Sequence, residues 1–561
     1  MMHIKKILLL SFTTVTLLVL NSGYVKASDN DHLNDSTSSL TNTENSSHKA
    51  NITLQGRGTA QNHLDRQRTR LRQTELQPTG FFVNEGDTVV IHVSGADNGR
   101  VLASIGIPEN GEITNHQLNE GRNEIVSTHS GVLNLINRNS DGDVQINIES
   151  NLDKIPFFVL GETTNEDWER MMTEYSTAPM VQLKSDRALI SVRYGSAQQF
   201  IEDAKDLMDY YDRFIRAQER IAGEVEGDEG IHRINPNYYH YVEANRLYMF
   251  ATHGHMGFNG DGALSRLLKT NNGWGPWHET GHLKQQAPWT WTAVVEATVN
   301  IYSLAAQEEI TGSANWLDNQ WPGVREYLVT NNKVYNNQSN EIKLAMFWQL
   351  HLTFGEEFYP RLHRRYREFD ERLVPSSDAQ RQQSFIIETS NISQINLIPF
   401  FEMWGFPIEQ NTQNQLSHLP VLDQSIWENE TSDHITIELP DEEIELPGYE
   451  YVLPDMIKDV RLVGNQFQVD IDREAQEGSN RIIFDVNGSY VAESFEGTAY
   501  TSRILIRTDD TVTIGLNNQV TVGDTLRIRL SSGRPGQASN MIEHITITVT
   551  PDGLEWSEIN N

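Results

Sequence analysis

The sequence predicts a multidomain α+β protein with an N-terminal β-sandwich, a mostly α-helical middle domain and a C-terminal all-β module. Three observations support this fold class. Short runs of alternating apolar residues, separated by turn residues, occur towards both ends of the chain. In the middle, apolar residues recur at steps of three and four, which is the period of a helix. The length of 561 residues leaves room for several domains of roughly 150 residues each.

Residues 1–27 have the pattern of a secretory signal peptide. Lys5 and Lys6 precede an apolar stretch over residues 7–20, and small residues at 25 and 27 suit a signal peptidase. The apolar stretch is shorter than the roughly 20 residues that cross a bilayer as a helix. We therefore expect cleavage after Ala27, a secreted, extracellular protein, and no membrane span once the signal is removed.

A polar segment separates this signal from the first predicted domain. Residues 28–51 are rich in Ser, Asn, Asp and Thr, which predicts a disordered linker. The N-terminal β-sandwich is predicted over residues 52–160, because short β-like runs alternate there with turn residues. The clearest of these runs cover residues 80–83, 88–93, 132–136 and 144–148.

The middle domain is predicted over residues 161–410. Phe200, Ala204, Leu207, Tyr211 and Phe214 belong to an apolar stripe with helical spacing, which predicts an amphipathic helix across residues 200–215. Further helices are expected at residues 292–310, 343–354 and 357–369.

An acidic, solvated linker is predicted over residues 411–450, and a β-module over residues 451–551. Asp441 to Glu445 is the most acidic part of this linker. The runs that predict the β-module cover residues 481–486, 502–506, 525–530 and 545–549.

The composition restricts which functions the chain can have. It contains no cysteine, so a metal site must be built from histidines and carboxylates. Its formal net charge of −33 repels polyanions, which argues against nucleic acid as a partner. We expect a monomer.

The strongest chemical signal is the H-E-x-x-H motif formed by His278, Glu279 and His282. On a helix, positions i and i+4 share a face, so both imidazoles can reach one metal ion. Glu279 lies on an adjacent face, where it can act as a base on a metal-activated water. Pro276 suits the first turn of such a helix, and Pro288 is expected to close it.

A third ligand and a supporting residue follow on the next predicted helix. Glu296 comes fourteen residues after His282, and a catalytic zinc site with two histidines and one glutamate is a known ligand set. Asn300 lies four residues later on the same helical face, where it can hold a ligand histidine in one tautomer. Gly281 inside the motif helix costs about 1 kcal/mol relative to Ala, which indicates close packing near a metal.

These residues resemble the enhancin-like M60 peptidases, which are mucin-targeting zinc enzymes of the gluzincin type. The resemblance is carried by Gly-Trp-Gly-Pro-Trp-His-Glu-Thr-Gly-His at 273–282 and Glu-Ala-Thr-Val-Asn at 296–300. Residues 78–83, 346–350 and 400–406 agree, and the similarity covers roughly residues 52–407. The family often has Val after the ligand Glu, where this chain has Ala297.

The resemblance implies a site and a substrate. It makes His278, His282 and Glu296 ligands of Zn²⁺ and Glu279 the catalytic residue. The implied substrate is mucin or another O-glycosylated protein, and residues 451–551 are similar to a mucin- or carbohydrate-binding module. Trp274 beside the motif could stack on a sugar, or it could simply pack the helix.

Two other groups of residues have simpler interpretations. His253 and His255 are expected to be hydrogen-bonded histidines rather than metal ligands. The basic run from Arg361 to Arg367 is expected to form ion pairs with glutamates four residues away, although it could also bind an acidic glycan.

Three functions fit the sequence. The first is a secreted zinc endopeptidase that cleaves O-glycosylated proteins, with Glu279 as general base. The second is a metallopeptidase that acts on unglycosylated proteins. The third is a non-catalytic adhesin that binds mucin, and the complete set of ligands and base argues against it.

Overall fold

The computed structural model describes the chain from Ala50 onward, with gaps. The described residues are 50–96, 99–140, 142–228, 230–369, 374–375, 377–431, 435–440, 457–464, 466–471, 481–486, 489–495, 498–500, 505–507, 511–515, 520–532, 540–551 and 553–556. The predicted signal peptide and residues 28–49 of the predicted linker lie outside this range. None of the helices in the described part has the length and apolar character needed to cross a membrane.

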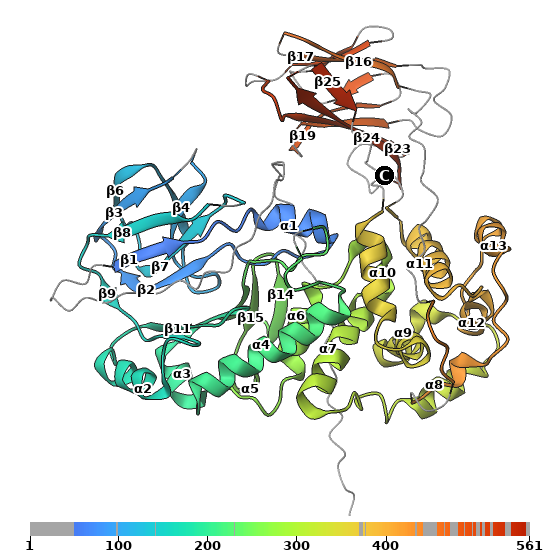
Figure 1. Cartoon of the computed structure of the whole chain (residues 1–561), viewed down its shortest axis with the longest axis horizontal. Coiled ribbons are helices and arrows are strands. Elements are labelled where there is room, and N and C mark those ends of the chain that lie inside the picture. Colours follow the sequence, from blue (N-terminus) through green and yellow to red (C-terminus); the bar gives the residue numbers. More distant parts are fainter. Residues whose placement is uncertain are drawn as a thin grey trace, which may run out of the picture.

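The N-terminal strands form two sheets that face each other across one apolar core (Figure 1). One sheet has the order β1-β8-β3-β6 and the other β5-β4-β7-β2-β9. Exposed and buried residues alternate along β3, as expected for a strand with one face on a core. The elements are β1 (Ala50–Leu54), α1 (Ala60–Gln67), β2 (Gln77–Val83), β3 (Thr88–Ser94), β4 (Val101–Ile105), β5 (Thr114–Leu118), β6 (Gly121–Val126), β7 (Gly131–Asn137), β8 (Val144–Ile148) and β9 (Asp153–Lys154).

Both predicted boundaries of this region need correction. Strand β1 begins at Ala50, so residues 50 and 51 belong to a sheet rather than to the linker. At the other end, residues 157–159 form β10, which pairs with β11 of the next region instead of with the sandwich. Sequence patterns cannot show this, because a strand looks the same whichever sheet it joins.

The middle region contains a six-stranded mixed sheet that the sequence analysis did not predict. Its order is β10-β11-β12-β13-β15-β14, with both parallel and antiparallel neighbours. Most of its residues are buried, so the strands lack the alternation that identifies a half-exposed strand. The strands are β10 (Phe157–Val159), β11 (Met180–Lys184), β12 (Ala188–Arg193), β13 (Tyr239–Glu243), β14 (Met249–Thr252) and β15 (His255–Phe258).

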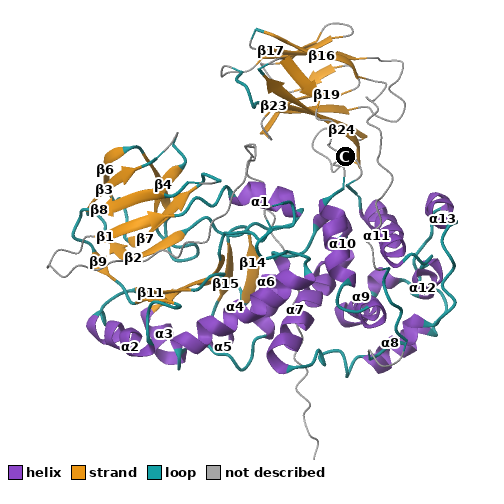
Figure 2. Cartoon of the chain, in the orientation of Figure 1, coloured by secondary structure: helices purple, strands orange, loops and turns teal. Residues whose placement is uncertain are grey.

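Helices make up most of the rest of this region (Figure 2). Helices α4, α6 and α7 contact one another, and α6 also contacts β14. The helices are α2 (Asn165–Glu174), α3 (Tyr194–Phe200), α4 (Ala204–Ile221), α5 (Asp261–Leu267), α6 (Trp274–His282), α7 (Val295–Thr311), α8 (Trp321–Leu328), α9 (Asn340–Phe354), α10 (Phe358–Arg367), α11 (Asp378–Ser393), α12 (Ile398–Met403) and α13 (Gln410–Leu416).

The helix predicted across residues 200–215 begins later than its apolar stripe suggested. Phe200 ends α3, Ile201 is extended, and α4 starts at Ala204. The Asp203 side chain accepts a hydrogen bond from the backbone N–H of Asp206 and thereby caps α4. The apolar spacing continued through the break because both helices pack on the same core.

The predicted acidic linker over residues 411–450 is also corrected. Residues 410–416 form α13, and the chain stays packed on the helical core as far as residue 440. Leu416, Leu419, Leu422 and Ile426 are buried there among otherwise polar residues. These widely spaced apolar contacts were not predicted because the segment is mostly polar. The acidic run at 441–445 lies outside the described residues.

The C-terminal strands form two further sheets, with the orders β16-β17-β22-β21 and β20-β19-β18-β23-β24-β25 (Figure 2). Val460, Phe467, Phe484 and Ile547 are among their buried residues. The strands are β16 (Ile457–Val463), β17 (Gln466–Ile471), β18 (Arg481–Val486), β19 (Ser489–Phe495), β20 (Thr498–Tyr500), β21 (Leu505–Arg507), β22 (Thr511–Gly515), β23 (Thr525–Ser532), β24 (Asn540–Thr550) and β25 (Gly553–Trp556).

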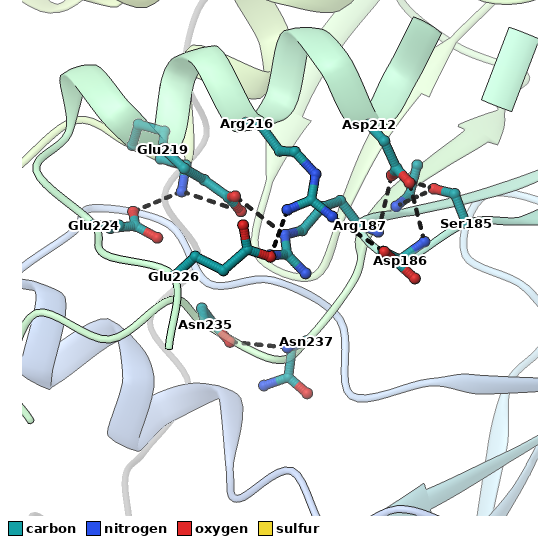
Figure 3. Close-up of polar contacts among 12 residues, drawn as sticks. Ser185, Asp186, Arg187, Asp212, Arg216, Glu219, Glu224, Glu226, Asn235 and Asn237 are labelled. Carbon is teal, nitrogen blue, oxygen red and sulfur yellow. Dashed lines mark hydrogen bonds and ion pairs between the residues drawn. The ribbon is translucent and has the colours of Figure 1, made fainter. Parts of the chain in front are cut away.

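A network of charged residues connects α4 with the sheet and with the chain that follows α6 (Figure 3). Arg187 on the sheet side pairs with Glu219 at 3.1 Å and with Glu226 at 3.4 Å. Lys284, two residues after α6, has its Nζ 2.6 Å from Glu224 Oε1 and 4.0 Å from Glu219 Oε1. The Lys284 and Glu224 side chains are only 2% exposed. The chain after α6 is therefore fixed to the end of α4 by buried charges.

Helix α4 also contacts the start of α6. Gln218 Nε2 donates a hydrogen bond to the backbone oxygen of Trp277 at 2.8 Å. Trp277 directly precedes His278, so neighbouring residues of α4 hold both ends of the motif helix. This arrangement restricts how α6 can move relative to the sheet.

Replacing Lys284 with Met should destabilise the fold by about 3–5 kcal/mol, because the buried carboxylate of Glu224 loses the cation that pairs with it. The free energy of unfolding of the full chain, measured with denaturant, tests this. The matched control is Lys205→Met, since Lys205 pairs with Asp209 on the surface and its side chain is 62% exposed. An equal and small effect of both substitutions would contradict the role given to Lys284.

Candidate metal centre

Helix α6 places the two motif histidines on one face. The ring centroids of His278 and His282 are 4.9 Å apart, and the rings are almost perpendicular. Pro276 occupies the first turn, where its missing N–H costs nothing. The helix ends at His282 with backbone hydrogen bonds from Leu283, so Pro288 does not terminate it as predicted. Pro288 lies instead in a short 3₁₀ turn over Ala287–Trp289.

Helix α7 brings the proposed third ligand to these histidines, and Gly281 allows it to come close. A Cβ atom on Gly281 would lie 2.7 Å from the backbone oxygen of Val299 and 3.0 Å from its Cγ2. No real Cβ atom tolerates the shorter of these distances, so any larger residue would push the two helices apart. The close packing predicted at Gly281 is thus a contact between α6 and α7.

His278, His282 and Glu296 converge on one point. Glu296 Oε2 lies 3.2 Å from His278 Nε2 and 3.7 Å from His282 Nε2. One donor atom from each of the three residues lies within 4.8 Å of the other two. Within the described residues, this is the one group of three or more such side chains close enough to hold a metal ion.

Two amide side chains orient the histidines. Asn300 Oδ1 lies 2.8 Å from His278 Nδ1, and Gln285 Oε1 lies 2.8 Å from His282 Nδ1. Each amide is itself fixed, because Asn300 Nδ2 donates to the Glu296 backbone oxygen and Gln285 Nε2 donates to Thr298 Oγ1. An amide oxygen can only accept, so each histidine carries its proton on Nδ1 and presents the Nε2 lone pair.

The three side chains therefore offer two neutral nitrogen donors and one carboxylate oxygen. This donor set fits zinc, which binds through imidazole nitrogen and carboxylate oxygen in catalytic sites. Glu296 is 34% exposed and His278 is 21% exposed, so the centre is open to solvent on one side. A catalytic metal needs such an open position for substrate or water.

The pKa values follow the charges around the centre. Burial by itself would lower the pKa of His278, but the hydrogen bond with Glu296 and the nearby carboxylates raise it to about 9. Burial would raise the pKa of Glu296, yet His278 and the surrounding positive charges lower it to about 2. Burial lowers the pKa of His282 to about 4. The carboxylates around His278 therefore favour a positive charge at this point, as a bound cation would supply.

Glu279 lies in the same site but forms none of these bonds. Its side chain is 6% exposed, and burial raises its pKa to about 7. No hydrogen bond or ion pair with another described residue reaches its carboxyl group. A carboxyl that has no protein partner although its side chain is largely buried calls for a functional explanation.

The other candidate residues have structural partners. Trp274 is half-buried, and its ring stacks on Trp316 with centroids 4.5 Å apart, so one ring face belongs to the core. His253 Nδ1 lies 3.4 Å from the backbone N–H of Arg72, and His255 lies 3.2 Å from Glu109. These two histidines are hydrogen-bonded, as expected.

The basic run has different partners from those predicted. Arg361 donates to the backbone oxygen of Pro440, and Arg367 is buried against the backbone oxygens of Ala222 and Gly223. Arg365 pairs with Glu388 on α11 at 2.8 Å. Arg364 pairs with Glu357, seven residues before it, at 3.4 Å. Arg361, Arg365 and Arg367 bind neighbouring elements because α10 is packed against them. Glu371, the predicted partner of Arg367, lies outside the described residues.

Sequence reasoning missed Gln285. It lies three residues after His282, which is a spacing that allows contact near the end of a helix, so the signal was present. The analysis of Asn300 used the same logic on α7. Nothing in the sequence indicated which of the two histidines each amide would orient.

A centre with two histidines and one glutamate on two packed helices, beside a buried carboxyl, is the site of a metallopeptidase-type protein. The family model described as Peptidase M60, enhancin and enhancin-like matches residues 152–405, which include all of these residues. This part of the chain belongs to the enhancin-like M60 peptidase family, and the resemblance seen in the sequence is confirmed.

Solved structures share the fold of this chain. A protein of unknown function from Bacillus anthracis is 24% identical, with a TM-score of 0.67 over 89% of this chain and 99% of that one. The ZmpB metallopeptidase from Clostridium perfringens is 18% identical, with a TM-score of 0.58 over 88% of this chain and 100% of that one. The M60 catalytic domain of ZmpC from the same organism, solved with the sialyl T antigen, is 19% identical, with a TM-score of 0.59 over 88% and 99%.

Curated relatives match a smaller part of the chain. TRPM8 channel-associated factor 1 from Bos taurus is 27% identical over 298 residues, which is 51% of this chain and 31% of that protein. The human protein of the same name is 27% identical over 284 residues, covering 48% and 30%. The chain spans about a third of the length of the curated relatives that it matches.

Replacing Gly281 with Ala should weaken zinc binding by roughly tenfold or more, because the added methyl separates Glu296 from the histidines. Titration of the purified chain with zinc against a competing chelator measures this loss. Gly195→Ala is the matched control, since it adds a methyl within helix α3 where nothing lies within 4 Å. Unchanged zinc affinity in the Gly281 variant would show that the helix contact does not set the site.

Proposed function

We propose that the chain is a zinc-dependent endopeptidase that cleaves O-glycosylated, mucin-type proteins outside the cell and acts as a monomer. One observation carries the proposal: three donor atoms of His278, His282 and Glu296 converge beside the buried carboxyl of Glu279. Membership of the M60 family supports the metallopeptidase activity.

His278, His282 and Glu296 would hold the zinc ion, and Asn300 and Gln285 would keep the histidines in the required tautomer. When bound, zinc supplies Lewis acidity that makes water a nucleophile near neutral pH and polarises a carbonyl. Glu279 accepts the proton of the attacking water at its carboxylate oxygen. It then delivers this proton to the nitrogen of the leaving amine as the peptide bond breaks.

The choice of a glycosylated substrate rests on relatives. The ZmpC catalytic domain was solved in complex with the sialyl T antigen, and a ZmpB structure joins its M60 domain to CBM51 domains. Trp274 is half-buried near the motif histidines and is our candidate for a glycan contact. The C-terminal β-module would bind carbohydrate and hold the enzyme on its substrate.

Two alternatives differ in what the site does. A metallopeptidase of unglycosylated proteins would use the same residues without a glycan contact. A non-catalytic adhesin would bind mucin through its β-modules, and the curated relatives are named for association with a channel and not for proteolysis. The retained base and ligands favour an enzyme over an adhesin.

Glu279→Gln should retain zinc but lose cleavage by a factor of at least about 10², because the general base is removed while the ligands remain. Metal content and cleavage rate are measured on the same preparation. Glu296→Ala is the counterpart, and it should lose most of its zinc because only two ligands remain. Full turnover by the Glu279 variant would remove Glu279 from the chemistry.

The substrate class is tested by incubating the full chain with mucin, deglycosylated mucin and casein, each with and without a chelator. We expect chelator-sensitive cleavage of intact mucin and loss of that cleavage after deglycosylation. Cleavage of casein and deglycosylated mucin at similar rates would favour a general peptidase. Absence of chelator-sensitive cleavage in every arm would favour the adhesin.

A further inference from the structure

Arg70 lies beside the metal centre although it is far from it in sequence. It follows α1, in a segment that runs along the residues just after α6. Arg70 N donates to the Gln285 backbone oxygen at 3.0 Å, Ala287 N donates to the Arg68 backbone oxygen at 2.8 Å, and Thr69 forms an antiparallel bridge with Gln286. These two hydrogen bonds, which form the bridge, fix the Arg70 backbone next to Gln285, the residue that orients His282.

The positive charge of Arg70 acts on the ligands, because it lowers the pKa values of Glu296 and His282. Its guanidinium is close enough to Glu296, Arg381 and Asp378 for their charges to act on its pKa. Burial and the neighbouring Arg381 lower that pKa, while Glu296 and Asp378 oppose the change. The side chain is partly exposed, so one side of it remains accessible.

No described residue forms a hydrogen bond or an ion pair with the Arg70 side chain. Its neighbour Arg381 is fully engaged, because Nε donates to the Ala287 backbone oxygen and Nη1 pairs with Asp378 at 3.0 Å. Arg72, two residues further on, donates to Gln61. Arg70 thus keeps five N–H donors and a positive charge without a protein partner, on a side chain that is partly exposed and can receive a ligand.

A bound zinc would leave the positive charge of Arg70 less compensated. Glu296 is the carboxylate with the larger effect on the pKa of Arg70, and its charge would be taken up by the metal. The surroundings of Arg70 would then carry a local excess of positive charge, although the chain as a whole has a net charge of −33. Such a place attracts a single anion, and a guanidinium binds a carboxylate through two parallel hydrogen bonds.

We propose that Arg70 is a substrate-binding residue whose guanidinium receives a carboxylate group of the substrate beside the scissile bond. This inference rests on the proposed function, since it assigns a substrate feature to the same site. The carboxylate has two possible sources with the same chemistry: an acidic sugar on the glycan, or an Asp or Glu side chain of the peptide.

The test measures binding and not turnover. The full chain with Glu279→Gln is loaded with zinc, and calorimetry measures its affinity for four short peptides with blocked termini. The first carries a sialylated O-glycan, the second the same glycan without sialic acid, the third an unglycosylated sequence with one Glu, and the fourth that sequence with Gln. Zinc content is determined for each preparation.

Adding Arg70→Gln should weaken binding of a carboxylate-bearing peptide by about tenfold or more and leave its neutral twin unchanged. Arg70→Lys should recover part of this loss, because it restores the charge without the planar fork. Arg72→Gln is the matched control from the same segment and should change neither affinity. Loss confined to the sialylated peptide identifies a sugar carboxylate, and loss confined to the Glu peptide identifies a side chain.

Equal weakening of acidic and neutral peptides, or no weakening at all, would overturn the inference. The same holds if no acidic peptide binds more tightly than its neutral twin before Arg70 is changed. A failure of the proposed function gives a different result, because the unsubstituted enzyme would then cleave none of the peptides whatever their affinities.

Discussion

The close contact between α6 and α7 is the constraint on which the site depends. The two motif histidines and Glu296 lie on different helices, so their separation is set by how closely the backbones approach. Gly281 permits that approach, because any side chain there would collide with the Val299 backbone oxygen. The same approach places Asn300 within hydrogen-bond distance of His278. The absence of a side chain at Gly281 thus sets both the distances between the donor atoms and the orientation of His278.

The surrounding structure holds this helix pair in place from several sides. Gln218 binds the backbone just before His278, and the buried Lys284 links the residues after His282 to Glu219 on α4 and to Glu224 just after it. Gln285 adds a third connection, since it joins His282 to Thr298 on α7. A metal centre needs donors fixed to within fractions of an ångström, and rigid support of this kind provides that precision.

The sequence predicts the site better than it predicts the fold around it. The shared face of His278 and His282, and that of Glu296 and Asn300, follow from helix geometry, which is local and regular. The six-stranded sheet was not predicted because its strands are buried and lack the alternation of apolar and polar residues. The packed segment after residue 410 escaped notice because its few apolar residues are spread among polar ones. The position of Arg70 depends on pairing between segments more than two hundred residues apart, and no local pattern records such pairing.

Two charged groups at this centre lack partners within the described chain: the Glu279 carboxyl and the Arg70 guanidinium. Each is only partly hydrated, and neither gains a partner from the described chain in return. A scaffold that only displays β-modules would be more stable with neutral residues at both positions. The cost is understandable if both groups meet substrate, one to move a proton and the other to hold a negative charge. Their joint presence beside converging metal ligands therefore favours an enzyme over an adhesin more strongly than the ligand set does alone.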